Sequence, residues 1–243
     1  VRMGAVLLVI YLINNRSNPA FKMVWMTIML VAPVFGVLLY IFVEMQVGVR
    51  WLNARLQHMH EMTRHHWTQD EKVREALKKE DSEVASLAHY VYEYGGFPAY
   101  ENTGIQYFHC GEDKIEELIR QLEKAQKFIF MEYFIVEEGE MWNETLAVLK
   151  EKAAAGVDVR LIYDGFGSMF TLPGDYDEEI RRAGIKCHVF NALHFSLHIS
   201  DYKMLNHRDH RKITVVDGET AFTGGLNFAD EYINRKQRCG VWK

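Results

Sequence analysis

From about residue 110 onward, the chain alternates between apolar patterns of helical period and short apolar runs. Apolar residues recur at the spacing of one helix face from Ile115 to Ala125, and the run 128–136 that follows is almost entirely apolar, as in a central strand covered on both faces. This alternation predicts an α/β lobe in which helices flank a mixed or parallel sheet. The expected elements are helices at 82–94, 115–125, 142–153 and 175–183, strands at 105–109, 128–136, 157–163 and 185–190, and a hairpin of 211–216 with 220–223.

A second constraint lies near the N-terminus, where residues 23–43 form a run of 21 residues without a charged side chain. Such a run is long enough to cross a hydrocarbon core of roughly 30 Å, and Trp25 and Tyr40 lie near its ends, where interfacial aromatic residues belong. Pro33 in its middle predicts a kink. Together with the shorter apolar run 3–13, the pattern predicts a multi-pass membrane anchor over residues 1–45, consisting of a truncated first helix and a second helix at 23–43.

The residues after this anchor are rich in charge and carry apolar residues at roughly helical spacing, which predicts a helical juxtamembrane linker at 46–81 and a folded lobe at 82–243. Four histidines in the linker lack a carboxylate or thiol that would complete a ligand set, so no metal site is expected there. Positive charges next to the apolar runs favour a cytoplasmic lobe by a narrow margin. The four histidines are His58, His60, His65 and His66. The charges on the side of the lobe are Arg2, Arg50 and Arg55, and those in the loop between the apolar runs are Arg16 and Lys22.

Composition excludes some classes of partner. The net charge of −5 gives no attraction of the whole chain to nucleic acid, and no cluster of Lys and Arg with interleaved aromatic residues is present, so no nucleic-acid partner is expected. Cys110, Cys187 and Cys239 are far apart and odd in number, which favours reduced thiols on the cytosolic side of a membrane.

The residues that indicate chemistry lie near the C-terminal end. His210 is followed two positions later by Lys212 and then by Asp217, and Gly224-Gly225 with Asn227 follows the hairpin. On an extended strand, side chains two residues apart share a face, so the imidazole and the ammonium of the first pair should project together. An imidazole beside a fixed cation is suited to binding and attacking a phosphate.

Structural explanations exist for parts of this pattern. Asp217-Gly218 between two apolar runs is typical of a hairpin turn, so Asp217 has an alternative role as a turn residue. Asn227 followed by Asp230 is typical of a helix N-cap with an acid in the first turn. The complete spacing, with both the His-Lys pair and the Gly-Gly-x-Asn segment, favours a functional site over these separate explanations.

The spacing His210-x-Lys212-x4-Asp217-x6-Gly224-Gly225-x-Asn227 resembles the signature of the phospholipase D superfamily. Within that superfamily the chain is similar to the bacterial cardiolipin synthases, and the supporting stretches are 14–20, 130–134 and 163–168. Enzymes of this family carry two such motifs, whereas this chain has one. The resemblance therefore implies one phospholipase D-like lobe, with the second His-Lys pair supplied by another lobe or by a second copy of the chain.

The family's reaction, as the resemblance implies, joins two phosphatidylglycerol molecules to give cardiolipin and free glycerol in a bacterial inner membrane. His210 would be the nucleophile that forms a phosphohistidine, or the general acid, while Lys212 and Asn227 would stabilise charge on the phosphate oxygens. A carboxylate is needed to hold the other imidazole nitrogen, and Glu231 and Asp217 are the candidates. No cofactor or metal is expected, because Lys and Asn supply the charge stabilisation.

Two other functions share these features. A hydrolase of the same superfamily would use water instead of an alcohol as acceptor, and a non-catalytic half-site would bind anionic headgroups without turnover. Residues 191–209 show no clear element and lead directly into His210, so they are expected to form the rim of the substrate entrance, with a mobile insertion as the alternative. Asp164 should lie at a strand end near this rim, and Gly165 stands where relatives often carry a second acid.

Overall fold

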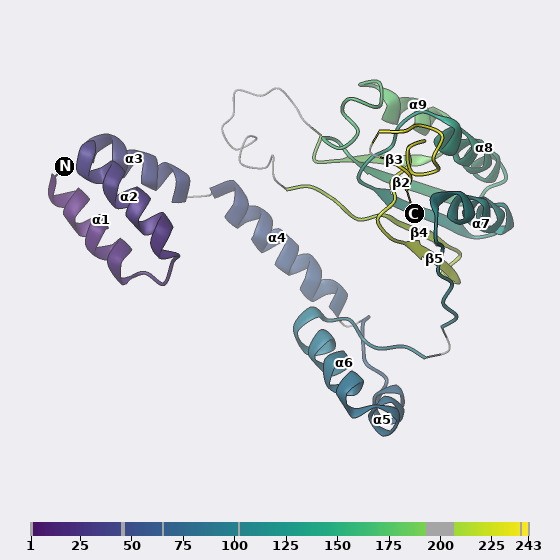
Figure 1. The fold of residues 1–243 in the computed structure, drawn as a ribbon, viewed down its shortest axis with the longest axis horizontal. Helices are drawn as coiled ribbons and strands as arrows, with labels where there is room; N and C mark the ends of the chain where they lie inside the picture. Colours follow the sequence, from purple (N-terminus) through teal and green to yellow (C-terminus); the bar gives the residue numbers. More distant parts are fainter. Residues whose placement is uncertain are drawn as a thin grey trace. The chain divides into compact units, whose positions relative to one another are not determined.

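The computed structural model describes residues 2–44, 47–64, 66–101, 103–192, 207–238 and 240–242 (Figure 1). The chain divides into two compact units, Val1–Tyr100 and Glu101–Lys243. The first unit is helical, and the second contains the sheet and the His210 motif.

The uncharged run near the N-terminus folds as two helices. α2 (Pro19–Val31) ends just before Ala32, which has φ −136° and ψ 78°, and α3 (Pro33–Glu44) begins at the next residue. Proline lacks a backbone N–H and disfavours the helical conformation in the residue before it, so Pro33 ends α2 instead of kinking it. The expectation of a single helix at 23–43 is therefore wrong, and none of the helices in the described residues is long and apolar enough to cross a membrane.

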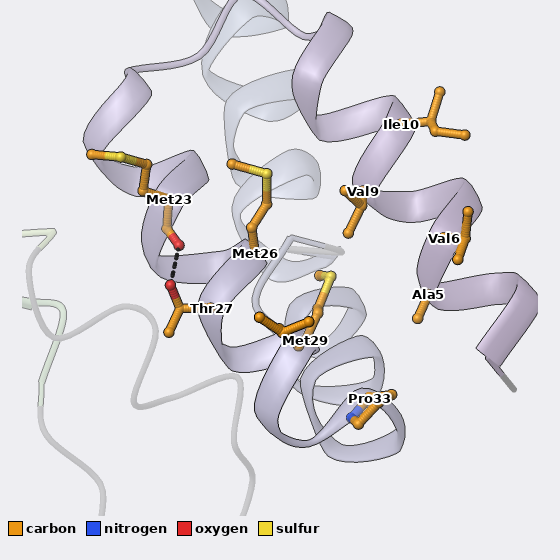
Figure 2. A pocket seen from close by; sticks show the side chains of 10 residues that line it. Ala5, Val6, Val9, Ile10, Met23, Met26, Thr27, Met29 and Pro33 are labelled. Atoms are coloured by element: carbon orange, nitrogen blue, oxygen red, sulfur yellow. Dashed lines mark hydrogen bonds between the residues drawn. The ribbon is translucent and has the colours of Figure 1, made fainter.

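The first three helices pack together through apolar side chains. α1 (Arg2–Asn14) contacts both α2 and α3, and Leu12, Met29 and Tyr40 are buried among them. α2 and α3 approach closely at Gly36, where an added Cβ would lie 2.9 Å from Met29 Cα. A cavity of about 680 Å³ lies among these helices, and Figure 2 shows its almost entirely apolar lining. Its one hydroxyl group, on Thr27, donates a hydrogen bond to the Met23 carbonyl at 2.9 Å.

Three further helices complete the first unit: α4 (Val47–Arg64), α5 (Glu71–Glu80) and α6 (Ser82–Gly95). The Asp81 carboxylate accepts hydrogen bonds from the backbone N–H groups of Glu83 and Val84, which begins α6 where the sequence predicts. α6 packs against α5 and belongs to the first unit, although the sequence grouped it with the sheet-bearing lobe.

The second unit contains a five-stranded mixed sheet of order β3-β2-β1-β4-β5. β1 (Phe128–Tyr133) pairs in parallel with β2 (Asp158–Asp164), which pairs in parallel with β3 (Lys186–Phe190). β4 (Ile213–Val216) runs antiparallel to β1 and forms a hairpin with β5 (Thr220–Thr223). The predicted α/β class with a mixed sheet is confirmed.

Helices cover one face of this sheet. α7 (Gly111–Lys124), α8 (Glu140–Ala154) and α9 (Tyr176–Arg182) contribute Leu118, Trp142 and Ile180 to the same core as Ile129 and Leu161 of the sheet. Trp142 is fully buried, and its indole N–H donates a 2.6 Å hydrogen bond to the Tyr176 hydroxyl.

Two predictions for this unit were wrong in detail. Residues 105–109 form no strand, and Ile105 and Tyr107 are 92% and 78% exposed, so this segment lacks both the pairing and the burial that a strand needs. β1 ends at Tyr133 instead of reaching residue 136, and only its alternate residues are buried; Phe128, Phe130 and Glu132 on its other face are half-buried in the described part of the chain. Apart from Glu132, the strand carries apolar side chains on both faces, although helices cover only one of them.

Candidate active site

The His210 motif lies at the edge of the sheet where the parallel strands end. β4 runs antiparallel to β1, with Ile213 opposite Glu132, so the residues before Ile213 lie beside the carboxyl end of β1. The carboxyl ends of β2 and β3 are at the same edge. Ligands of open α/β sheets bind at this kind of edge, which agrees with the predicted position of the site.

His210 and Lys212 both meet the ring of Phe134, the first residue after β1. The His210 ring lies 4.7 Å from the Phe134 ring between centroids, and Lys212 Nζ lies 5.1 Å from the Phe134 centroid. The two residues precede β4, so the expected shared face of a strand does not exist, and the aromatic ring brings the two side chains together instead. His210 is exposed, whereas Lys212 is only 4% exposed.

The Lys212 ammonium is held beside the histidine backbone. Its Nζ donates a 2.6 Å hydrogen bond to the His210 carbonyl. Burial lowers the pKa of Lys212, and the nearby Asp209 carboxylate acts in the opposite direction. A cation with few water contacts interacts strongly with a phosphate that enters the site.

Asp164, at the end of β2, fixes the chain that leads into the motif. Its buried carboxylate accepts hydrogen bonds from the N–H groups of Phe166 and Gly167 and, across the edge of the sheet, from that of Asp209 at 2.9 Å. Arg208 Nη1 adds an ion pair at 3.3 Å. Asp164 lies at a strand end, as the sequence predicts, and its role in the structure is to position the two residues before His210.

Two glycines let the loop after β2 pack against the site. A Cβ on Gly167 would lie 2.2 Å from the Phe134 carbonyl oxygen, and a Cβ on Gly165 would lie 2.7 Å from Ala192 Cα. Gly167 therefore supports the residue whose ring contacts both His210 and Lys212. Gly165 leaves no space for an acidic side chain.

A carboxyl pair, held together by Arg211, lies next to the motif. Glu132 of β1 and Asp209 share a hydrogen bond, and Arg211 forms ion pairs with Glu132 at 2.6 Å and with Asp209 at 3.0 Å. Burial and the neighbouring Asp209 raise the pKa of Glu132 to about 7. Burial also acts to raise the pKa of Asp209. The hydrogen bonds from Glu132 and Arg211 outweigh this effect, and the pKa of Asp209 is lowered as a result. The sequence analysis missed this group, whose only local signal is the acid and the base on either side of His210.

This pair predicts a pH-dependent stability. Because the pKa of Glu132 in the folded chain exceeds its ordinary value of 4.5, folding takes up a proton, and stability should fall as the pH rises from 4.5 to 7. The loss should be on the order of 2 kcal/mol. Glu132→Gln, which stays neutral, should remove this slope in urea unfolding measured between pH 5 and 8. Glu219→Gln, at an exposed position in the β4–β5 turn, is the control, and parallel profiles for wild type and Glu132→Gln would contradict the shared proton.

Asp217 does not contact the imidazole. It lies in the turn at the far end of β4, with φ 55°, and its carboxylate accepts hydrogen bonds at 2.8 Å from the N–H groups of Gln126, Lys127 and Phe128. Asp217 is therefore a turn residue, which was the alternative that the sequence left open, and its carboxylate also caps the start of β1. The expectation that Asp217 orients the histidine is not supported by this geometry.

The other predicted residues lie near the motif but have partners of their own. Asn227 is buried, accepts a hydrogen bond from the Ile135 N–H at 3.0 Å and donates one to the Tyr232 hydroxyl at 2.8 Å. These bonds join the end of β1 to the Gly224-Gly225 segment. Glu231 pairs with Arg238 at 3.6 Å, and in the residues that the structure describes it makes no contact with His210.

The predicted rim is described only at its two ends. Residues 193–206, with His194, His198 and Lys203, lie outside the described residues. At the ends, Asn191 Nδ2 donates a 2.8 Å hydrogen bond to the His207 carbonyl, and Arg208 Nη1 donates one to the Asn191 carbonyl at 3.2 Å. These bonds close the base of the segment beside the residues that lead to His210.

Comparisons with known proteins identify the family of the chain. A family model described as the phospholipase D-like domain of cardiolipin synthase matches residues 118–242, and one described as the phospholipase D-nuclease N-terminal domain matches residues 4–44. An uncharacterized protein of Streptococcus mutans is 40% identical over 97% of this chain and 50% of its own length. Cardiolipin synthase 1 of Bacillus cereus is 33% identical over 95% of this chain and 45% of its own length.

The chain thus spans about half the length of the curated relatives it matches. The domain match covers just over half of the chain and includes the whole sequence from His210 to Asn227. The chain therefore belongs to the cardiolipin synthase family of the phospholipase D superfamily.

Proposed function

We propose that this chain forms one catalytic lobe of a phosphatidyltransferase that makes cardiolipin and glycerol from two phosphatidylglycerol molecules. The observation that carries the proposal is the exposed imidazole of His210 beside the buried ammonium of Lys212, both against Phe134. A nucleophile that solvent reaches next to a desolvated cation suits attack on a phosphodiester. The catalytic unit is this chain together with a second His-Lys pair, from another lobe or from a second copy.

The reaction proceeds in two displacements at phosphorus. A nitrogen of the His210 imidazole attacks the phosphorus of the first phosphatidylglycerol, a P–N bond forms, and the P–O bond to the headgroup glycerol breaks. The histidine of the second pair donates a proton to the departing glycerol oxygen. A headgroup hydroxyl of the second phosphatidylglycerol then gives its proton back to that histidine and attacks phosphorus, which breaks the P–N bond and releases cardiolipin.

Charge stabilisation in this scheme comes from side chains of the lobe. Lys212 neutralises the nonbridging oxygens, provided that its ammonium turns from the His210 carbonyl toward the phosphate. Asn227 keeps one amide hydrogen beyond its bond to Tyr232 and is proposed to donate it to a phosphate oxygen. The scheme uses no metal or cofactor.

The helices α1–α3 are proposed to hold the lobe at the cytoplasmic face of a bacterial inner membrane. Supporting this, large apolar side chains cover their outer surfaces, including Leu30 at 82% exposed, Val31 at 79% and Phe21 at 68%. The cavity in Figure 2 is lined almost entirely by carbon and sulfur, and such a surface favours acyl chains over water.

The test is a product analysis with the catalytic unit in phosphatidylglycerol vesicles. Cardiolipin and free glycerol should appear in equal amounts, and added short alcohols should be incorporated into phosphatidyl products. Formation of phosphatidic acid without cardiolipin would show that the protein is a hydrolase and not a transferase. Vesicle binding without any product would indicate a non-catalytic half-site.

A further inference from the structure

A buried lysine lies outside the site described so far. Lys114, in the first turn of α7, is only 6% exposed, and in the described residues its ammonium has no hydrogen-bonding or ion-pair partner. Burial lowers the pKa of Lys114. An ammonium that is partly removed from water and has no counterion costs folding free energy, so its presence where the cavity opens suggests that an anion completes the site.

The acidic residues of the same turn do not pair with Lys114. Glu112 accepts a 2.8 Å hydrogen bond from Asn234 Nδ2, which directs this carboxylate to the C-terminal segment. Asp113 is exposed. The Lys114 charge is therefore available to an anion from outside.

Lys114 lines a cavity of about 320 Å³ in the sheet-bearing unit. Its Nζ lies 3.9 Å from the position that a Cβ on Gly224 would occupy, so the ammonium is next to the glycine pair. The cavity is also lined by the polar side chains of Gln106, His109 and Thr223 and by the Cys110 thiol, and its aromatic wall comes from Tyr107, Phe108 and Trp242.

The glycine pair also lines this cavity. The N–H groups of Gly224, Gly225 and Leu226 make no hydrogen bond within the part of the chain that the structure describes. Thr223 pairs with Ile213, so the glycine pair begins where β5 ends, next to the residue that follows Lys212. The cavity therefore adjoins the catalytic edge of the sheet.

We propose that the Lys114 cavity binds a phosphate group that does not react, held by the Lys114 ammonium and the N–H groups of the Gly224-Gly225 turn. A tetrahedral phosphate has enough oxygens for the ammonium, these amides and the side chains of Gln106 and His109. The cavity exceeds the volume of a bare ion and accommodates a small polyol attached to the phosphate. Resting on the proposed function, the source is the headgroup of the second phosphatidylglycerol, whose own phosphate must stay intact while its hydroxyl attacks.

The experiment measures binding to the full 243-residue chain. The soluble probes are inorganic phosphate and glycerol 3-phosphate, in buffers of constant ionic strength, and the membrane probes are vesicles of phosphatidylglycerol mixed with phosphatidylcholine or of phosphatidylcholine alone. The variants are Lys114→Met, which keeps the apolar stem, Lys114→Arg, which keeps the charge, and Lys124→Met, an exposed control in the last turn of α7. Lys212→Met separates binding at the catalytic pair from binding at Lys114.

Lys114→Met should weaken binding about tenfold or more, while Lys114→Arg and Lys124→Met stay close to wild type. If Lys114→Met weakens binding of the soluble probes, the ligand is a free phosphate. If it weakens binding only to the vesicles that contain phosphatidylglycerol, the ligand is a lipid headgroup. Without ligand, Lys114→Met should unfold at a higher temperature than wild type, because methionine fills the same space without a charge.

Equal binding by wild type and Lys114→Met would overturn the inference. If binding at the same time remained sensitive to Lys212→Met, the catalytic assignment would stand and only the second phosphate site would be lost. A Lys114→Met variant that unfolds at a lower temperature than wild type would also count against an unpaired ammonium in the cavity.

Discussion

Replacing His210 with alanine should reduce cardiolipin formation by about 10³-fold or more, because the variant has no atom that can form the bond to phosphorus or donate the proton. The imidazole is exposed and contributes a ring contact with Phe134 but no core packing, so the variant should fold normally. The measurement is the rate of cardiolipin formation by the catalytic unit. His188→Ala is the matched control, since His188 is an exposed histidine on β3 of the same sheet.

A second readout separates the two roles open to His210. If His210 is the nucleophile, acid-labile phosphate from labelled phosphatidylglycerol should accumulate on the wild-type lobe and be absent from His210→Ala. If the label still appears on the second histidine of the unit while turnover stops, His210 is the general acid. Undiminished turnover in His210→Ala would contradict both roles.

Asp217→Ala should lower the free energy of unfolding by about 3 kcal/mol, because three backbone N–H groups would lose a charged acceptor. The carboxylate bonds to Gln126, Lys127 and Phe128, which join α7 to the central strand. Asp217 also has φ 55°, a conformation that aspartate and asparagine tolerate better than alanine. Urea unfolding of the chain measures the effect.

Asp217→Asn should recover part of this loss, because its amide oxygen still accepts hydrogen bonds. Glu219→Ala, in the same turn, controls for loss of a nearby charge. Burial acts to raise the pKa of Asp217, but the three backbone hydrogen bonds outweigh it and lower the pKa, so its stabilisation should be lost as the pH falls below 3.8. A normal stability together with a large loss of activity in Asp217→Ala would restore the catalytic role that the sequence suggested.

The elements of the lobe were predictable because each has a strong period or a clear stop signal. α7 buries Ile115, Leu118 and Leu122, the residues that defined the stripe, and α8 ends just before Gly156, whose φ is 91°. One error arose where tertiary pairing decides, and the other where the local effect of a proline was underestimated. Residues 105–109 have a strand-like composition but no neighbouring strand, and the uncharged run at the N-terminus has the length of one helix but is divided at Pro33.

The candidate site was predictable in its residues more than in its geometry. The spacing identified His210 and Lys212, but their meeting depends on Phe134, which is more than 70 positions earlier in the chain. The partners of Asp164 and Glu132 are likewise distant in sequence, and only folding brings them to Asp209. Asp217 had two explanations in the sequence, and its hydrogen bonds to residues 126–128 favour the structural one.

The hydrogen bonds between Asn191 and residues 207 and 208 have a consequence for how the chain tolerates changes of length before His210. They join the two ends of the intervening segment, and Asp164 separately fixes Asp209. Lengthening a loop whose ends are already joined costs little free energy. Changes of length between residues 192 and 207 should therefore leave the position of His210 unchanged, because the described residues on either side are already held to each other and to Asp164.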